Sequence, residues 1–81
     1  MRFLFTAWFH DDRSPEDNFA ASFIIEAGSA EDAKEWGDTL ASARAARTGE
    51  VFFRSQIEPG EDESLPVIPC GYDASPEEIG W

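Results

Sequence analysis

Basic residues are scarce in this sequence. Six Lys and Arg stand against 17 Asp and Glu among 81 residues, which gives a formal net charge of −11 at pH 7. Proteins that grip nucleic acid by its phosphates need clustered Lys and Arg, so this balance excludes a nucleic-acid partner. The scarcity is greatest near the C-terminus: no basic residue follows Arg54, and every charged side chain in segment 58–81 is acidic.

Cysteine and histidine occur once each. A single cysteine cannot form an internal disulfide, so the fold depends on packing alone. A zinc site needs several His or Cys ligands, and we expect neither a metal nor another cofactor. The thiol of Cys70 lies between Pro69 and Gly71 in an acidic stretch that disfavours a thiolate, so we interpret it as a small packing residue rather than a nucleophile.

Long apolar runs are also absent. The longest nearly apolar stretch, residues 3–9, falls far short of the roughly 20 residues that cross a bilayer. It sits at the short limit for the apolar part of a secretory signal, and His10 and two aspartates follow it where small residues are needed. We therefore expect a cytoplasmic protein with no membrane partner.

Aromatic residues, in contrast, are plentiful: they make up 14% of the chain, with seven Phe and three Trp. This content disfavours disorder and predicts one small packed domain over residues 1–81. Apolar residues in short, alternating runs predict strands at 2–9, 19–27 and 50–58. Residues 10–18 are predicted to form a polar loop with a helical turn beginning at Ser14.

The clearest helix is predicted over residues 30–47. Ser29 is suited to cap its N-terminus, and Gly49 tolerates the left-handed conformation that ends a helix. One face carries the stripe that should pack on the sheet, made of Ala33, Trp36, Gly37, Leu40 and Ala43. Beyond the third strand, two prolines limit residues 65–72 to an extended edge segment, and residues 75–81 resemble a capped helical turn.

A strand, helix, strand succession of this length forms a right-handed crossover, which makes strands 19–27 and 50–58 parallel to each other. Strand 2–9 is the most apolar and suits the position between them, antiparallel to both. The fold class is therefore α+β: a mainly antiparallel sheet of three to four strands with one helix packed on one face. The acidic segment 58–81 is expected to pack on the sheet or on a partner.

The sheet face away from the helix is predicted to be apolar, because Leu4, Trp8, Ile24 and Phe52 alternate with the helix-facing residues. Leaving four such side chains in water would forfeit about 6–12 kcal/mol, which approaches the stability of a small domain. The face must therefore be covered, either by the chain's own tail, with Tyr72 and Trp81, or by a second copy or another protein.

Three functional hypotheses follow. The leading one is a non-catalytic protein-interaction module that forms a homodimer, because no catalytic constellation is present. The second is an inhibitor or immunity-type protein that blocks a basic partner with the acidic turn Glu61, Asp62 and Glu63. The candidate interaction residues of these two hypotheses are Leu4, Trp8, Ile24, Phe52, Glu61, Asp62, Glu63, Tyr72 and Trp81.

The third hypothesis is a small enzyme or ligand binder with a site between subunits. The only ligand-type cluster that includes a histidine begins with His10, Asp11 and Asp12, but its spacing matches no known calcium or zinc motif. Glu26 and Arg54 are expected on one sheet face, where they could form a structural ion pair across the strands.

Overall fold

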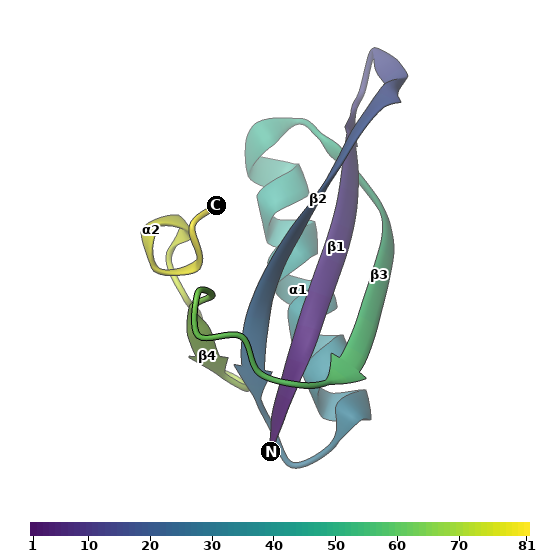
Figure 1. Ribbon diagram of the computed structural model, residues 1–81. Coiled ribbons are helices and arrows are strands. Elements are labelled where there is room, and N and C mark those ends of the chain that lie inside the picture. The colour runs from purple at the N-terminus through teal and green to yellow at the C-terminus, as the bar shows by residue number, and fades with distance from the viewer.

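The computed structural model describes residues 1–81 and is α+β, with a four-stranded sheet and one main helix packed on it (Figure 1). The sheet order is β3-β1-β2-β4. The elements, in chain order, are β1 (Arg2–Asp11), β2 (Ser14–Glu26), α1 (Ala30–Thr48), β3 (Val51–Pro59), β4 (Val67–Pro69) and α2 (Pro76–Ile79). None of the helices has both the length and the apolar character needed to cross a bilayer.

The predicted strand order is confirmed. β1 lies between β2 and β3 and is antiparallel to both, so β2 and β3 run in the same direction, as the crossover requires. The extended edge segment forms β4, which pairs parallel with the last three residues of β2 from Ile24 to Glu26. β4 adds few backbone hydrogen bonds to the sheet, because Pro66 precedes it and Pro69 is its last residue, and proline has no N–H to donate.

The predicted loop at 10–18 is wrong. β1 continues to Asp11 and β2 begins at Ser14, so the two strands meet in a tight hairpin whose tip is Asp12 and Arg13. The Asp11 carboxylate accepts a hydrogen bond from the Arg13 backbone N–H at 2.8 Å, which fixes this turn. Strand pairing with β1 outweighs the local capping signal at Ser14, and Figure 1 shows the hairpin projecting beyond the rest of the molecule.

The predicted helix is confirmed to within one residue. The Ser29 hydroxyl accepts from the Asp32 backbone N–H at 3.1 Å, and Gly49 takes a φ of 80° at the C-terminal end. Ala33, Gly37 and Leu40 are buried on the sheet as expected, but Ala43 is exposed and Ala41 is buried in its place. α1 therefore turns its small residues to the sheet at a slightly different angle from the predicted stripe.

The core lies between α1 and the sheet. The helix-facing residues of β1 are all buried, and across from them β2 adds Phe23 and Ile25. α1 lies mainly over β3 and β1 and touches β2 little, which leaves the helix side of β2 to be covered by something else. The core residues of β1 are Phe3, Phe5, Ala7 and Phe9.

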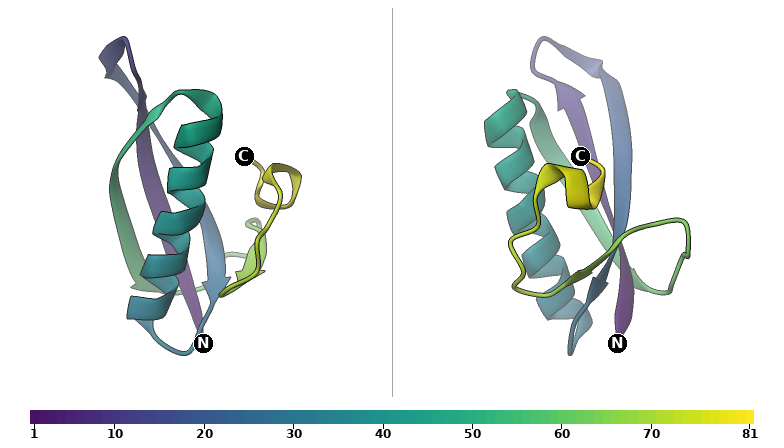
Figure 2. Two further views of the ribbon diagram at one scale, coloured as in Figure 1. Left: turned by 180° about the vertical axis from the view of Figure 1, so that it is seen from behind. Right: turned by 90° about the vertical axis from the view of Figure 1, so that its left-hand side faces the viewer.

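The C-terminal segment provides that cover. Ile68, Ala74 and Ile79 are buried in the same core as α1, and Trp81 meets Phe23 edge-on with 5.3 Å between ring centroids. Figure 2 (right) shows α2 and the chain end lying across the side of the molecule where α1 and β2 face each other. The end of the tail therefore packs on the helix side of the sheet, so Trp81 does not cover the opposite face, as one of the two alternatives supposed.

A bulge in β3 changes which face its aromatic residues occupy. Arg54 pairs with Trp8, but Phe52 pairs with Phe9, so Phe53 is an extra residue between them. Phe52 consequently faces α1 and packs on the core, and the prediction that it faces away is wrong. Phe53 takes the outward direction and is 49% exposed.

Candidate interaction face

The sheet face opposite α1 is named here the open face, because only one end of it is covered by the chain. In Figure 1 the sheet lies in front of α1, so this face points toward the viewer. The strand register and the alternation of side chains assign its members. They are Arg2, Leu4, Thr6, Trp8 and His10 on β1, Asn18, Ala20, Ser22, Ile24 and Glu26 on β2, and Val51, Phe53, Arg54, Gln56 and Glu58 on β3.

Trp8 and Arg54 form the centre of the exposed part of this face. They are cross-strand neighbours on β1 and β3, and the guanidinium carbon of Arg54 lies 4.6 Å from the centroid of the Trp8 ring. Such a cation–π contact at an exposed site contributes about 0.5–1 kcal/mol and holds the long side chain in one direction. Trp8 stays half-buried and Arg54 exposed.

Arg54 has no carboxylate within ion-pair distance, although the chain carries 17 acidic residues. The predicted pair with Glu26 is wrong, because these residues lie at opposite ends of the sheet: Arg54 is level with Trp8 and Glu26 with Arg2. Glu26 instead accepts from Arg2 at 2.8 Å. Arg54 thus keeps donors free for a carboxylate from elsewhere.

The open face is also close to electrically neutral. Its strand positions carry two arginines and two glutamates, in a chain whose net charge is −11. Arg2 is neutralised within the chain, since it donates to Glu26 and, at 2.6 Å, to Glu61. These hydrogen bonds raise the pKa of Arg2 further above its ordinary value. The strand positions of the open face are therefore balanced in charge, and the repulsion of an acidic partner is least at the end that carries Arg54.

One end of the open face is covered by the segment that joins β3 to β4. Figure 1 shows this connection crossing in front of β1 near its start, and Figure 2 (right) shows it standing out on the side away from α1. Ile24 lies beneath it with Leu65 and Val67 as neighbours and is 1% exposed. Of the predicted interaction residues, Ile24 is thus already covered, and Leu4 and Trp8 are half-buried.

The other aromatic candidates lie elsewhere. Trp81 is half-buried on the helix side, where it contacts Phe9 and Phe23. Tyr72 is 46% exposed, and its backbone carbonyl accepts from the indole N–H of Trp36 at 3.1 Å. Neither belongs to the open face, because the C-terminal segment passes beside β2 to the helix side of the sheet.

The acidic turn lies at the covered end of the open face. Glu61, Asp62 and Glu63 are all exposed. Ser64 orients Asp62 by donating both its hydroxyl, at 2.6 Å, and its backbone N–H, at 2.9 Å, to one carboxylate oxygen. Both hydrogen bonds lower the pKa of Asp62 and so favour its ionised form, and the bond from the Ser64 hydroxyl has the larger effect.

The residues proposed for metal or ligand binding are not assembled into a site. His10 contacts Phe53 in a tilted arrangement with 5.3 Å between ring centroids, and its Nδ1 lies 2.8 Å from the Asp11 carbonyl oxygen. No three His, Cys, Asp or Glu side chains are placed to hold one ion. Cys70 is exposed, contrary to its interpretation as a packing residue, and lies level with Glu26 at the end of the sheet away from His10.

A groove of about 330 Å³ separates the last turns of α1 from the C-terminal segment. Leu40, Ile79 and Trp81 form its apolar walls, and Arg47 and Asp73 are its charged members. The only hydroxyl among its lining residues belongs to Ser75, which is used in the cap of α2. The groove therefore contains no nucleophile paired with a base, and it offers no catalytic arrangement.

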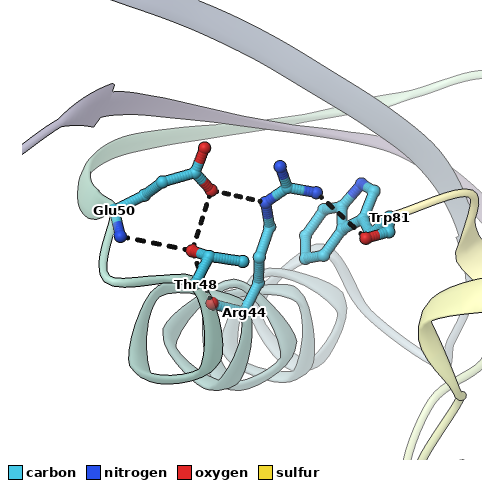
Figure 3. Close-up of polar contacts among 4 residues, drawn as sticks. All are labelled: Arg44, Thr48, Glu50 and Trp81. Atoms are coloured by element: carbon cyan, nitrogen blue, oxygen red, sulfur yellow. Dashed lines mark hydrogen bonds and ion pairs between the residues drawn. The ribbon is translucent and has the colours of Figure 1, made fainter.

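Sequence reasoning missed one polar cluster, which is built around Arg44 (Figure 3). Its guanidinium donates to Glu50 at 3.0 Å and to the Trp81 carbonyl oxygen at 3.3 Å, and it lies over the rings of Phe9 and Phe19. The charge of Arg44 suits the C-terminal end of the helix dipole, but that charge alone does not predict these contacts. The spacing of Arg44 and Glu50 around Gly49 is the signal that could have indicated this pair.

We interpret the Arg44 cluster as structural rather than as a binding site, because Nε and Nη1 of Arg44 and the Oε1 atom of Glu50 already have partners within the chain. The site that remains for interaction is the open face, with Trp8 and Arg54 at its centre. Comparison of the chain with protein-family models, with curated proteins and with solved structures finds no match.

Proposed function

We propose that this chain is a non-catalytic protein-interaction module that forms a homodimer, and that its binding surface is the open face with the adjoining margin of β3. The observation that carries the proposal is Arg54. It is held over Trp8, exposed, and without a carboxylate partner in a strongly acidic protein. Aromatic and arginine side chains of this kind contribute most of the binding energy at protein interfaces.

The charge distribution supports the same surface. Two copies that each carry a charge of −11 repel one another in most orientations. The strand positions of the open face are the exception, since their arginines and glutamates balance, and the acidic turn lies at the other end of this face from Arg54. A second copy can therefore approach at the Arg54 end with less repulsion, and Arg54 can donate to a carboxylate of that copy.

The proposal is tested by the solution mass, measured by light scattering over a hundredfold dilution. Because Cys70 is exposed, the Cys70→Ser protein is used throughout to exclude copies joined by a disulfide. We expect twice the 9.0 kDa of one chain at the highest concentrations, and a weaker dimer for Trp8→Ala and Arg54→Gln. Arg13→Gln removes the same charge from the hairpin tip and should leave the dimer unchanged.

Two results would contradict the proposal. A mass of 9.0 kDa at every concentration would remove self-association. A dimer equally strong in wild type, Trp8→Ala and Arg54→Gln would place the interface on another surface. Far-ultraviolet circular dichroism of each variant establishes that a loss of dimer is not a loss of fold.

A second candidate is an inhibitor of a basic protein, favoured by the exposed and ionised acidic turn. Asp62 is oriented by Ser64, and its lowered pKa keeps it charged well into the acid range. In this case the triple variant Glu61→Gln, Asp62→Asn, Glu63→Gln should lose salt-sensitive binding to a basic column or protein while the homodimer persists. Binding that survives in the triple variant removes the turn from this role.

A further inference from the structure

We infer that the second copy joins along the outer edge of β3, in an antiparallel β3–β3 pairing centred on Gln56. This inference rests on the homodimer proposed above and specifies how the two copies meet. It follows from the free edges of the sheet, from the order of charges along β3, and from what lies on either side of that strand.

The sheet has two edges, and they differ in how well they are protected. β4 is only three residues long and is flanked by prolines, so it offers almost no backbone groups to another strand. The part of β2 that extends beyond β4 begins with Pro15, Glu16 and Asp17, and like charges there oppose pairing with a second acidic chain. Residues 18–23 of this edge are uncharged, so they offer no group that could form a cross-strand ion pair with a second copy.

β3 lacks such protection in its middle. It forms the other edge of the sheet, so its outer N–H and C=O groups have no strand partner. The bulge at Phe53 and the proline at position 59 bound a regular stretch from Arg54 to Glu58. Unpaired edge groups of this kind readily accept an added strand.

The charges along this stretch are self-complementary. Arg54, Gln56 and Glu58 point to the open face, in the order positive, neutral, negative. When a second β3 lies antiparallel with Gln56 opposite Gln56, each Arg54 is directly opposite Glu58 of the other copy. The two-fold axis thus forms two opposite-charge cross-strand pairs and one amide pair.

Neighbouring symmetric registers lack this match. Centring on Ser55 places Arg54 opposite Gln56, and Glu58 opposite Phe52. Centring on Ile57 places Glu58 opposite Gln56, and Arg54 opposite Gly60. Of these three registers, only the one centred on Gln56 places a carboxylate opposite Arg54. The guanidinium of Arg54 has no ion-pair partner within its own chain.

The helix side of β3 also tolerates a second copy. There the Ser55 hydroxyl donates to Asp38 of α1, and Asp38 is neutralised by Lys34 at 3.0 Å. The α1 carboxylate that contacts this stretch of β3 is therefore balanced within its own chain. Pairing would join the two sheets into one of eight strands and the two open faces into one surface.

Complementary charge reversal tests this register. Arg54→Glu places carboxylates opposite Glu58 of the other copy, and Glu58→Arg places guanidinium groups opposite Arg54, so each variant alone should dimerise about tenfold more weakly or worse. Mixed together, the two variants should form a heterodimer, because every reversed residue then meets its opposite. Native mass spectrometry distinguishes this species, since the two chains differ in mass.

Two controls match the change in net charge. Glu31→Arg lies on the exposed start of α1 and Arg13→Glu on the hairpin tip, and neither should affect the dimer. The double variant Arg54→Glu, Glu58→Arg should dimerise with itself again. Circular dichroism and melting temperature of each single variant establish that it is folded.

The outcomes separate this inference from the proposed function. If the wild type is a dimer but mixing the two variants gives no heterodimer, the pairing at Gln56 is wrong and the homodimer stands. If the single variants dimerise as well as wild type, the edge of β3 is not the interface. If the wild type is monomeric at every concentration, the homodimer and this inference fail together.

Discussion

Gly37 of α1 lies directly against the ring of Phe5 at the centre of the sheet. A Cβ atom built at Gly37 would stand 2.4 Å from two carbons of that ring. The helix and β1 therefore lie so close together at this point that only glycine fits at position 37 without a shift of its neighbours. The Phe5 side chain is fully buried there, with 0% exposure.

Gly37→Ala should destabilise the protein, although alanine is the better helix former by about 1 kcal/mol. Overpacking a core of this kind costs about 1–3 kcal/mol, and the Phe5 ring has no free space into which it can shift. The two effects together give an expected net loss of up to about 2 kcal/mol in urea unfolding. Gly28→Ala is the control, because its new Cβ would meet nothing within 4 Å. An increase in stability for Gly37→Ala would show that the contact relaxes freely.

Arg44→Ala should lower the unfolding free energy by about 2 kcal/mol, because it leaves the half-buried Glu50 without its charge partner and uncovers the Phe9 ring. Arg44→Lys keeps the charge but not the planar donor set, and should recover only part of the loss. Arg47→Ala, an exposed residue without an ion pair, should change stability by less than about 0.5 kcal/mol. Equal stability of Arg44→Ala and wild type would show that the cluster in Figure 3 adds nothing.

Tyr72 and Glu78 make the attachment of α2 dependent on pH. Hydrogen bonding to Tyr72 lowers the pKa of Glu78 below its ordinary 4.5, and the same contact raises the pKa of Tyr72 above 10.0. The Glu78 contribution is complete above about pH 4.5 and is lost as the pH falls through the lowered pKa. The Tyr72 contribution is complete below about pH 10 and is lost as the pH rises through the raised pKa.

An NMR titration of the two side chains measures both shifts. Glu78→Gln should lower the pKa of Tyr72 toward its ordinary value without restoring it fully, because partial burial and Asp73 also raise it. Tyr72→Phe should raise the pKa of Glu78 toward its ordinary value, again without restoring it fully. The remaining reduction comes from Ser75, whose backbone N–H and hydroxyl also bind this carboxylate. Unshifted titrations in the wild type would mean that the contact is not formed in solution.

Trp81→Ala should reduce stability by about 2 kcal/mol, since the ring meets both Phe9 and Phe23 edge-on. Tyr72→Ala, which removes an exposed ring of the same segment, should cost less. Thermal melts monitored by circular dichroism compare the two. If Trp81→Ala has the same melting temperature as wild type, the indole of Trp81 does not stabilise the core.

Local patterns predict most of the fold. Ser29 and Gly49 fix the ends of α1, and the apolar alternation of β1 places it in the middle of the sheet. The hairpin is different, because Ser14 and Pro15 resemble a helix start and only pairing with β1 makes them a strand. Tertiary contacts outweigh a local signal there.

The candidate face is predictable only in part. Leu4 and Trp8 follow from alternation, but two adjacent phenylalanines give no indication of which one is the bulge, so Phe52 was placed on the wrong face. The face of the sheet on which Trp81 packs also depends on the position of α1, since the helix leaves the helix side of β2 partly uncovered. The position of α1 over β3 and β1 has no signal in the periodicity of the sequence.

The weak attachment of the C-terminal segment to the sheet determines where the domain should open first. It is joined to the sheet by only three residue pairs of β4, whereas β1 is paired along both sides. Segments with so few backbone hydrogen bonds detach in local opening events that leave the rest of a domain folded. Amide hydrogen exchange should therefore be slowest in β1 and much faster from β4 onward. In that opened form Phe9 and Phe23 would meet water while the helix and hairpin persist, so proteases and aggregation would act first on this transient species.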